Sequence, residues 1–331
     1  MLLSSCMPPK NMIETHDLVK RYNKHNAVDK VSLAIEEGEI FGLLGPNGAG
    51  KTTTMMMLTT LRKPTSGSAE VNGFDIVKEP AKVRKSIGIV FQDPSSDEIL
   101  TGYENLKLHG MLYDMPGDLR EKRIKEVLAL VDLSGRKNDL VKKYSGGMRR
   151  RLELARGLMH HPKILFLDEP TLGLDPQTRE HIWVYIERLA KEEKITIVIT
   201  THYMEEADKL CDRVAIIDSG KIVALGRPKN LKEQLGGDII RLKTRKLNVE
   251  ALKKLKYVKE INKGDGEYVL TIVGANEHLQ EILAIAGKVD SVELSSPTLG
   301  DVFLHFTGKN IREDTPEGGW GEKAIQASAR K

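Results

Sequence analysis

One segment fits the phosphate-binding pattern G-x-x-x-x-G-K-S/T, since it reads Gly45-Pro46-Asn47-Gly48-Ala49-Gly50-Lys51-Thr52. An apolar run precedes it and a helical pattern follows. The glycines let the backbone curl so that its N–H groups face a phosphate, and the helix start adds partial positive charge. Lys51 would supply a point charge to the β and γ phosphates, and the Thr52 hydroxyl would bind Mg²⁺. The motif indicates a nucleoside triphosphate site.

Two adjacent acids, Asp168 and Glu169, end the apolar run Ile164-Leu165-Phe166-Leu167. A buried strand that ends in two acids is the Walker B pattern, in which Asp168 would hold Mg²⁺, through water. Successive strand residues point to opposite sides, so Glu169 cannot share that role. It is the better candidate to orient or deprotonate the attacking water. Taken alone, such a pair more often begins a surface loop; the phosphate motif favours the catalytic interpretation.

Two further polar side chains follow expected strands. His202 comes after the apolar run 195–200 and would hydrogen-bond a γ-phosphate. Gln92 ends the run 87–91, and its amide would meet both Mg²⁺ and water. A lone histidine or glutamine carries little information, so both assignments depend on the two stronger motifs.

A second helix start of phosphate-binding type lies at Tyr144-Ser145-Gly146-Gly147-Met148, before a helix expected over 148–159. A serine and two glycines ahead of a helix make an N-terminal anion site. Taken alone, the segment would be an ordinary serine N-cap after a loop.

The elements that must position these residues alternate. Short strands are expected at 31–35, 40–44, 71–73, 87–91, 164–167 and 195–200. Helices are expected at 51–61 and 117–135, and around 182–189, where apolar residues recur at helical spacing. Strands that alternate with helices indicate an α/β fold.

From residue 226 the pattern changes to strand 239–244, helix 249–255, strands 258–262 and 268–273 with a turn at 264–266, helix 277–286 and strand 291–294. This β-α-β-β-α-β order is the ferredoxin-like split unit. We therefore expect a cassette over 12–225, an α+β accessory domain over 226–308 and a disordered tail over 309–331. The accessory domain contains no phosphate or metal motif.

Composition narrows the classes of function. The 331 residues include 51 basic and 47 acidic side chains, a balance that argues against a nucleic acid partner. Cys6 and Cys211 are too few for a disulfide framework or a zinc site, and we expect free thiols. No apolar run approaches the ~18 residues that span a bilayer, and the N-terminus lacks the basic region of a secretory signal. We expect a cytoplasmic location.

With these motifs in this order, residues 13–235 resemble an ABC ATPase, most closely the daunorubicin-resistance-type ATP-binding subunits of ABC-2 exporters. The resemblance implies a RecA-like P-loop core with a helical subdomain at about 93–160, and ATP and Mg²⁺ as ligands. It implies that Ser145-Gly146-Gly147 of one subunit completes the ATP site of another. Tyr22 matches the aromatic that stacks on adenine, and Asp175 matches the D-loop that crosses the dimer interface.

The resemblance also defines the expected ATP-binding residues of the chain itself. They are Tyr22, Gly45, Pro46, Asn47, Gly48, Ala49, Gly50, Lys51, Thr52 and Thr53. Residues 297–303 resemble the end of the C-terminal domain in the same subgroup, although Gly300 stands where an acid is expected. Tyr144 and Met148 replace the commonest leucine and glutamine of the signature.

The function implied is ATP hydrolysis that drives a separate membrane-spanning permease, with export of a drug, lipid or glycan. A second ATPase subunit, identical or different, would complete the dimer, and the region 92–113 would meet the permease. One alternative is a soluble ABC ATPase acting on chromosomes or ribosomes, but 53–143 lacks the heptads of the chromosome type and one cassette is present, not two. A module without enzymatic activity is disfavoured by Glu169 and His202.

Overall fold

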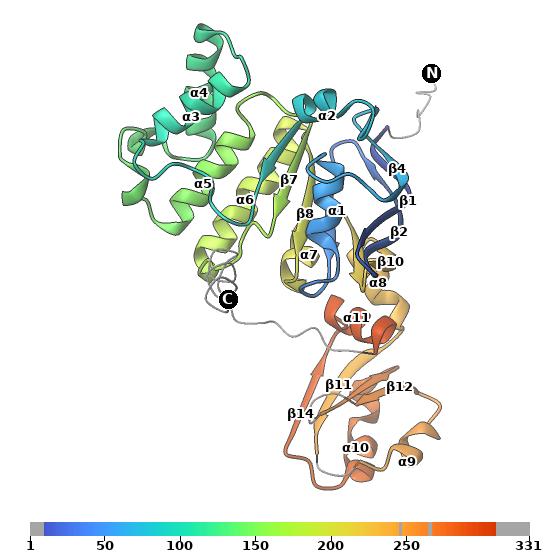
Figure 1. The fold of residues 1–331 in the computed structure, drawn as a ribbon. Coiled ribbons are helices and arrows are strands. Elements are labelled where there is room, and N and C mark those ends of the chain that lie inside the picture. The colour runs from blue at the N-terminus through green and yellow to red at the C-terminus, as the bar shows by residue number, and fades with distance from the viewer. Residues whose placement is uncertain (1–9, 245–246, 264–266, 309–331) are drawn as a thin grey trace, which may run out of the picture.

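The computed structural model describes residues 10–244, 247–263 and 267–308, and three β-sheets organise them (Figure 1). The N-terminal sheet is antiparallel, with the order β2-β1-β4-β5. Its strands are β1 (Asn11–Tyr22), β2 (His25–Glu36), β4 (Ser66–Val71) and β5 (Phe74–Asp75).

The central sheet has the order β10-β9-β3-β8-β7-β6. All neighbours are parallel except β10, which runs antiparallel to β9. Its inner strands are buried along almost their whole length because helices or another sheet cover both faces. The strands are β3 (Ile40–Leu44), β6 (Ile87–Val90), β7 (Ile164–Asp168), β8 (Thr196–Thr201), β9 (Arg213–Asp218) and β10 (Lys221–Gly226).

Different layers cover the two faces of the central sheet. Phe41 and Phe166 pack with α1 (Lys51–Leu58) and the N-terminal sheet. Leu165 and Leu167 belong to the core shared with the helices of the other face. That face carries α5 (Gly146–Gly157), α6 (Pro176–Glu193) and α7 (Met204–Leu210). The short α2 (Pro80–Ser86) leads into β6.

A helical subdomain lies between β6 and β7 and contains α3 (Gly102–Leu112) and α4 (Gly117–Leu130), which pack together and against α5 (Figure 1). Thr101 and Glu104 form a capping box that starts α3. Two 3₁₀ turns, Ser134–Arg136 and Val141–Lys143, follow α4. The expected helix over 117–135 is too long by about a turn, since Asp132 adopts a left-handed φ of 52°.

The C-terminal sheet has the order β12-β13-β11-β14 and is antiparallel. This is the expected ferredoxin-like arrangement, and it confirms that prediction. Its elements are β11 (Asp238–Lys243), α9 (Val249–Lys253), β12 (Val258–Lys263), β13 (Tyr268–Ile272), α10 (Ala275–Ala286) and β14 (Ser291–Ser295). The expected turn at 264–266 and the expected disordered tail lie outside the described residues.

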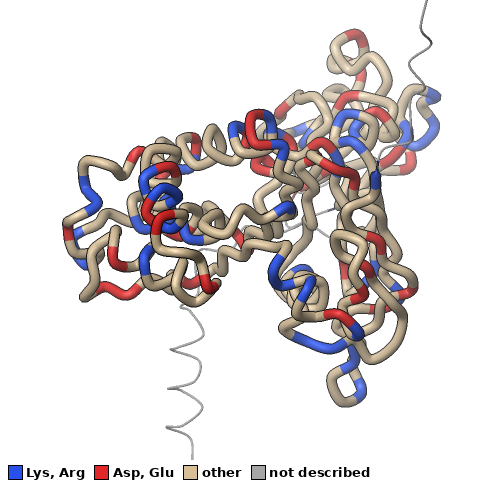
Figure 2. Tube along the Cα trace, turned by 90° about the horizontal axis from the view of Figure 1, so that it is seen from above, with Lys and Arg blue, Asp and Glu red and all other residues tan. Residues whose placement is uncertain are grey.

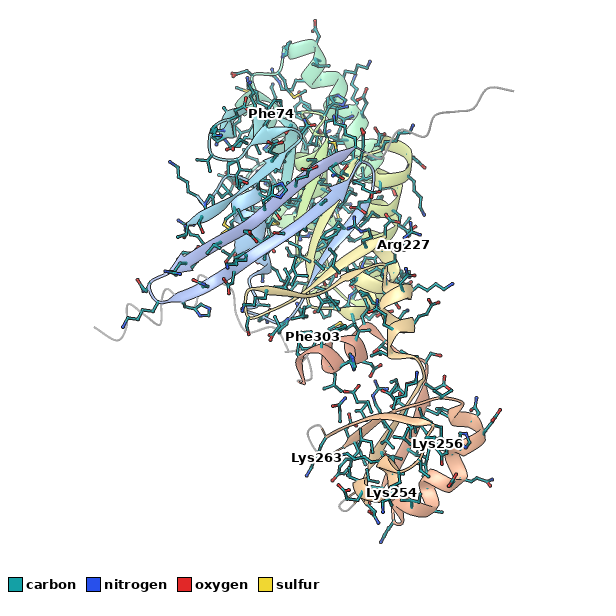
Figure 3. All side chains as sticks on the ribbon, turned by 90° about the vertical axis from the view of Figure 1, so that its right-hand side faces the viewer. Phe74, Arg227, Lys254, Lys256, Lys263 and Phe303 are labelled. Carbon is teal, nitrogen blue, oxygen red and sulfur yellow. The ribbon has the colours of Figure 1, made fainter. Side chains whose placement is uncertain are left out.

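The chain ends its described part with α11 (Leu299–Thr307), a helix that the sequence reasoning missed. On one side Leu304 packs on Ile239 and Val269 of the C-terminal sheet. On the other side Phe303 enters the core of the cassette, with α8 (Pro228–Leu235) and α7 as neighbours (Figure 3). Helices α8 and α11 therefore share the cassette's core although they belong to the segment 226–308.

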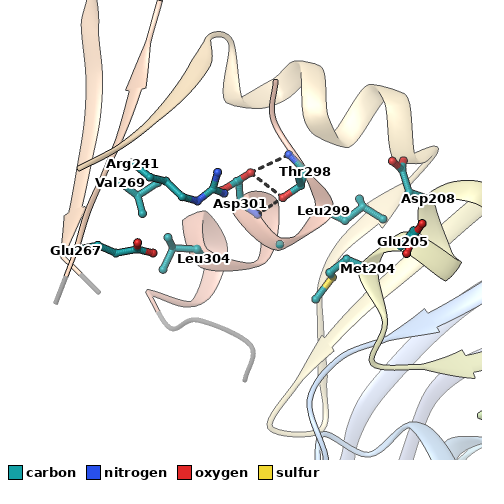
Figure 4. Close-up of a pocket in the computed structure, with 11 residues that line it drawn as sticks. Met204, Glu205, Asp208, Arg241, Glu267, Val269, Thr298, Leu299, Asp301 and Leu304 are labelled. Atoms are coloured by element: carbon teal, nitrogen blue, oxygen red, sulfur yellow. Dashed lines mark hydrogen bonds and ion pairs between the residues drawn. The ribbon is translucent and has the colours of Figure 1, made fainter. Parts of the chain in front are cut away.

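A cavity of about 480 Å³ lies where α7, α11 and the C-terminal sheet meet (Figure 4). Asp301 accepts hydrogen bonds from the backbone N–H and hydroxyl of Thr298, and it forms an ion pair with Arg241 from β11. A Cβ at Gly300 would lie 3.8 Å from Met204 Cγ, an ordinary contact. The same Cβ would lie 3.4 Å from Thr298 Oγ1, so the fold accommodates a Cβ at this position, where the family pattern has an acid.

Two further sequence expectations need correction, and one strand was not expected. The strand expected at 71–73 ends at Val71, because Asn72 and Gly73 both have positive φ and form a turn. The helix expected over 51–61 ends at Leu58. Strand β1, which pairs with both β2 and β4, was not predicted, since buried and exposed positions along it alternate irregularly around bulges.

Charged side chains of both signs are interspersed along the described chain (Figure 2). Within the described ranges, no helix combines the length and the apolar character needed to cross a bilayer.

Candidate functional site

The phosphate-binding loop joins β3 to α1 as expected. Two of its positions require glycine for steric reasons. A Cβ at Gly45 would lie 2.2 Å from the carbonyl oxygen of Ile217, and one at Gly50 would lie 2.3 Å from that of Ala27. Gly50 also has a φ of 108°, which disfavours any side chain. The loop is thus held between β9 and β2, with its curved backbone fixed by packing.

Lys51 begins α1 and is almost buried, with 4% of its surface exposed. Its Nζ donates to the carbonyl oxygens of Gly45, at 2.7 Å, and Pro46, at 3.1 Å. Nζ also lies 3.6 Å from Glu169 Oε1. Burial lowers the pKa of Lys51 from its ordinary value, although Glu169 and Asp168 oppose that shift. The ammonium of Lys51 therefore lies against the backbone of the phosphate-binding loop, close to the Walker B acids.

Thr52 and Asp168 meet across the gap between α1 and β7, since Thr52 Oγ1 donates to Asp168 Oδ1 at 3.1 Å. Thr200, at the end of β8, also donates its hydroxyl to Asp168 Oδ1. Burial raises the pKa of Asp168, while both hydroxyl donors act to lower it. A hydroxyl and a carboxylate are the oxygen ligands that suit Mg²⁺, so these residues fit that cation. Sequence reasoning quoted Thr200 only as a neighbour of His202.

Glu169 adopts an unusual backbone conformation immediately after β7, with a φ of 46°. Its N–H donates to Thr200, at 3.0 Å from the carbonyl oxygen and 3.1 Å from Oγ1. Its Oε2 lies 3.1 Å from His202 Nδ1. Burial acts to raise the pKa of Glu169, but His202 and Lys51 outweigh it, so the pKa is lowered from its ordinary value. An ionised carboxylate held in this way is suited to accept a proton.

The order of the strands brings the expected catalytic residues to one edge. Strands β3, β8, β7 and β6 are consecutive parallel neighbours, so their carboxyl ends present the loop, His202, Asp168 and Gln92 in turn. Gln92 is exposed, and among the described residues no hydrogen bond or ion pair joins it to Asp168 or Thr52. Its role as a metal ligand therefore stays a prediction.

Tyr22 ends β1 and exposes 44% of its surface. Lys20 Nζ lies 5.4 Å from the centre of the Tyr22 ring. The β1–β2 hairpin also contains Ala27, which abuts Gly50. The ring is accessible on the hairpin that packs on the loop, and adenine stacking remains a prediction.

The signature segment starts α5, where Ser145 is the N-cap and its Oγ accepts from the backbone N–H of Met148 at 3.3 Å. A Cβ at Gly147 would lie 2.5 Å from Thr178 Cγ2, so α6 packs directly on this glycine. Asp175 caps α6 by accepting from the N–H and the hydroxyl of Thr178, at 3.0 and 2.6 Å. Within the chain Asp175 is thus a helix cap, and its role across a dimer interface is untested.

The two anion-type helix starts belong to opposite faces of the central sheet: α1 packs with one core and α5 with the other (Figure 1). No hydrogen bond or ion pair between described residues joins Ser145-Gly146-Gly147 to the phosphate loop. One chain therefore presents two separate helix starts of the kind that can bind an anion.

Sequence reasoning missed two charged residues on the buried side of α5. Arg150 donates to backbone carbonyls beside the site. Glu153 accepts from the N–H groups of Ser95 and Ser96 and from the Ser95 hydroxyl. The run Arg149-Arg150-Arg151 looks like a solvated surface, and only the helical spacing of Arg150 with Glu153 and Leu154 indicates the buried side.

Replacing Asp168 with asparagine is expected to remove the Mg²⁺-dependent part of ATP affinity. Asparagine still accepts from the hydroxyls of Thr52 and Thr200, so the fold should persist, but the ligand charge is lost. The parent should bind fluorescent ATP at least about tenfold tighter in Mg²⁺ than in EDTA, which is about 1.4 kcal/mol. The variant should bind with the same affinity in both. A variant with the parent's Mg²⁺ dependence would show that Asp168 is not the ligand.

Comparison with known families adds two matches. Residues 28–172 match the ABC transporter family, and residues 226–307 match the C-terminal domain of DrrA1-3-like ATP-binding proteins. These regions contain the phosphate loop, the signature and Walker B, and the ferredoxin-like unit with α11.

Similar proteins cover almost the whole chain. The linearmycin resistance ATP-binding protein LnrL of Bacillus subtilis is 38% identical, over 91% of this chain and 100% of its own length. The daunorubicin/doxorubicin resistance ATP-binding protein DrrA of Streptomyces peucetius is 39% identical, over 91% of this chain and 93% of its own. Among solved structures, the dimeric post-hydrolysis state of the cassette MJ0796 with ADP and Pi has a TM-score of 0.59 and 30% identity, covering 65% of this chain and 98% of that one.

Proposed function

Because this chain belongs to the ABC transporter ATP-binding proteins of the daunorubicin-resistance type, and so is the ATP-hydrolysing subunit of an exporter, we propose that Lys51 binds the phosphates and Glu169 activates the water. The observation that carries this proposal is the convergence of Lys51, Glu169 and His202 at one edge of the central sheet. The similar proteins are resistance exporters' ATP-binding proteins, which gives no support to a chromosome or ribosome ATPase.

Nucleotide binding starts from the loop and its helix. The backbone N–H groups of the loop and the N-terminus of α1 surround the β and γ phosphates, and Lys51 turns its Nζ from carbonyl oxygens to phosphate oxygens. Thr52 and Asp168 hold Mg²⁺, which when bound neutralises the charge of the β and γ phosphate oxygens. Tyr22 provides a face for adenine at the end of β1.

Hydrolysis then depends on Glu169. The carboxylate accepts a proton from water as the water oxygen bonds to the γ phosphorus, and the bond between that phosphorus and the ADP oxygen breaks. His202, 3.1 Å from Glu169, orients the carboxylate and reaches the γ-phosphate. Gln92, which follows the neighbouring strand, would contact the metal and the water.

The proposed phosphate site at Ser145-Gly146-Gly147 requires a second subunit. Within one chain the Ser145 seat and the Lys51 site lie on opposite faces of the sheet, so the nucleotide of one subunit meets Ser145-Gly146-Gly147 of another. ABC ATP-binding subunits work as dimers, and the similar cassette MJ0796 is dimeric with ADP and Pi bound. We propose the same sandwich here, with an identical or a related second subunit, in which Asp175 lies at the interface.

The permease, which such subunits require, is proposed to bind the loop before α3 and the end of α3. Ile99 and Leu112 expose 74% and 73% of their surfaces, and Leu108, Met111 and Tyr113 are also exposed. Leu108, Met111 and Leu112 lie at helical spacing and share one face of α3. Exposed apolar groups on one helix face suit a partner helix. The subunit would thereby sit at the cytoplasmic side of the membrane, driving export of a drug, lipid or glycan.

Cysteines placed at Ile99 and at Leu112 are expected to cross-link to the co-expressed permease, with yields that change when ATP is added. Cys6 is replaced by serine in this background, and Cys211 stays, since burial raises the pKa of its thiol well above its ordinary value. Val292→Cys, an exposed apolar position on β14, is the control. Adducts from Val292→Cys with none from the α3 region would refute the proposed surface.

A further inference from the structure

The guanidinium of Arg150 lies inside the molecule, between the signature helix and the catalytic edge of the central sheet. Only 7% of the residue is exposed. No ion pair involves it among the described residues, which is unusual because a buried charge is costly unless a carboxylate faces it. Among the described residues, its hydrogen-bond partners are all backbone carbonyl oxygens.

Four carbonyl oxygens accept hydrogen bonds from this side chain. Nε donates to Pro170 at 2.7 Å, and Nη1 donates to Phe91 at 2.6 Å. Nη2 donates to Asp168 at 3.0 Å and to Glu169 at 3.1 Å. Four of the five N–H groups of a guanidinium are thus used, an arrangement that only the planar fork of arginine can make.

These carbonyls belong to the segments that carry the catalytic groups. Three of them form the turn that contains Glu169, whose φ of 46° is strained for a residue with a side chain. The fourth, at Phe91, precedes Gln92. Because a carbonyl held on each side of Glu169 fixes its peptide planes, Arg150 determines where the Glu169 carboxylate points.

We propose that Arg150 is a positioning residue for hydrolysis. From helix α5 it holds in place both Glu169 and the start of the loop that contains Gln92. The inference rests on the proposed roles of Glu169 and Gln92. Removal of Arg150 should leave the phosphate-binding loop unchanged and misplace the base.

Glu153, a buried acid on the same helix, extends this link. Glu153 accepts from Ser95 and Ser96, so the loop after Gln92 is tied to α5 at both ends, by Arg150 and by Glu153. Helix α5 also begins at Ser145, the seat for the other subunit's nucleotide. Helix α5 therefore connects Glu169, the proposed base of a subunit's own ATP site, with Ser145, which is proposed to contact the nucleotide of the other subunit.

Arg150→Gln is the direct test, because glutamine is shorter and has only two N–H donors. Turnover of Mg-ATP should fall about 10–100-fold, as expected for a small displacement of a reacting group, while KM stays within about threefold. Arg150→Lys keeps the charge but not the fork, and its turnover should lie between those of the parent and Arg150→Gln.

Arg123→Gln is the matched control. Arg123 is also 7% exposed and also donates to a backbone carbonyl, that of Leu158 at 2.9 Å, but in the helical subdomain. Its loss measures the general cost of removing a buried guanidinium. An equal fall in turnover for Arg123→Gln and Arg150→Gln, at equal loss of thermal stability, overturns the proposal.

A double variant separates positioning from general damage. If Arg150 acts through Glu169, adding Arg150→Gln to Glu169→Gln should slow the residual hydrolysis by less than twofold. A full further 10–100-fold loss, or a loss of ATP affinity instead of turnover, overturns the proposal. If Arg150→Gln does not fold, Arg150→Lys decides, and parental turnover in that variant overturns it. Parental turnover in Glu169→Gln alone refutes the assigned base instead.

Discussion

Glu169→Gln is expected to bind Mg-ATP about as tightly as the parent and to hydrolyse it about 10²–10⁴-fold more slowly. The amide keeps the size of the side chain but cannot accept the proton of the attacking water. Ground-state phosphate contacts come from Lys51, Thr52 and the loop N–H groups, which remain, so turnover falls while affinity survives. The variant also releases Lys51 from its carboxylate neighbour, which favours phosphate binding.

The same variant is expected to accumulate as a dimer in Mg-ATP, because unhydrolysed nucleotide stays between Lys51 of one subunit and Ser145 of another. The parent should return to the monomer after each turnover. Adding Ser145→Arg should abolish the dimer, since Ser145 begins α5 and the arginine places bulk and charge in the phosphate seat.

Size-exclusion chromatography with light scattering, with and without Mg-ATP, and a phosphate-release assay measure both effects. Hydrolysis at the parental rate would show that Glu169 is not the base. Slow hydrolysis by a protein that remains monomeric would keep the base and reject the sandwich dimer of isolated subunits.

Lys51→Ala is expected to weaken ATP binding about 30–5,000-fold, the loss that accompanies about 2–5 kcal/mol for a buried charge that loses its partner. Lys51 is almost wholly buried, so no solvent-exposed lysine can replace it at the phosphates. Its removal also takes a cation from Glu169, so the pKa of Glu169 should rise relative to the parent.

Fluorescent-ATP titration in Mg²⁺ measures the affinity, and thermal unfolding without nucleotide checks that the fold persists. Lys78→Ala serves as the control, because 83% of the Lys78 side chain is exposed and its ammonium pairs with Asp75. A folded Lys51→Ala protein with the parent's affinity would place the triphosphate elsewhere.

Part of the fold could be predicted from the sequence because the sequence signals for it are local. The phosphate loop needs a strand, glycines at fixed positions and a helix start, all within consecutive residues, and each was found where the pattern indicated. The C-terminal unit was predictable for the same reason: periods of two and of 3.6 residues distinguish its strands from its helices. Local periodicity reports which positions are buried, and burial sufficed for both.

The sequence reasoning failed at one turn and at one helix. Asn72-Gly73 is a dipeptide typical of turns, and the strand predicted over 71–73 overlooked that signal. In α11 the apolar residues are nearly consecutive, so their spacing does not distinguish a helix from a strand. Helix α11 is also stabilised by contacts on two sides, with Leu304 on the C-terminal sheet and Phe303 in the cassette's core. Neither contact is visible in a sequence window.

By itself the sequence predicted the chemistry proposed for the site, because Lys51, Thr52, Asp168 and Glu169 are recognisable from residue type and spacing. Only the tertiary structure decided which other residues lie beside them. Periodicity does not state which strands are neighbours, and the strand order β3-β8-β7-β6 places His202 beside Glu169. A run of arginines also does not show which of them is buried. Packing of α5 on the sheet buries Arg150, and its guanidinium then donates to the backbone carbonyls of the turn that contains Glu169.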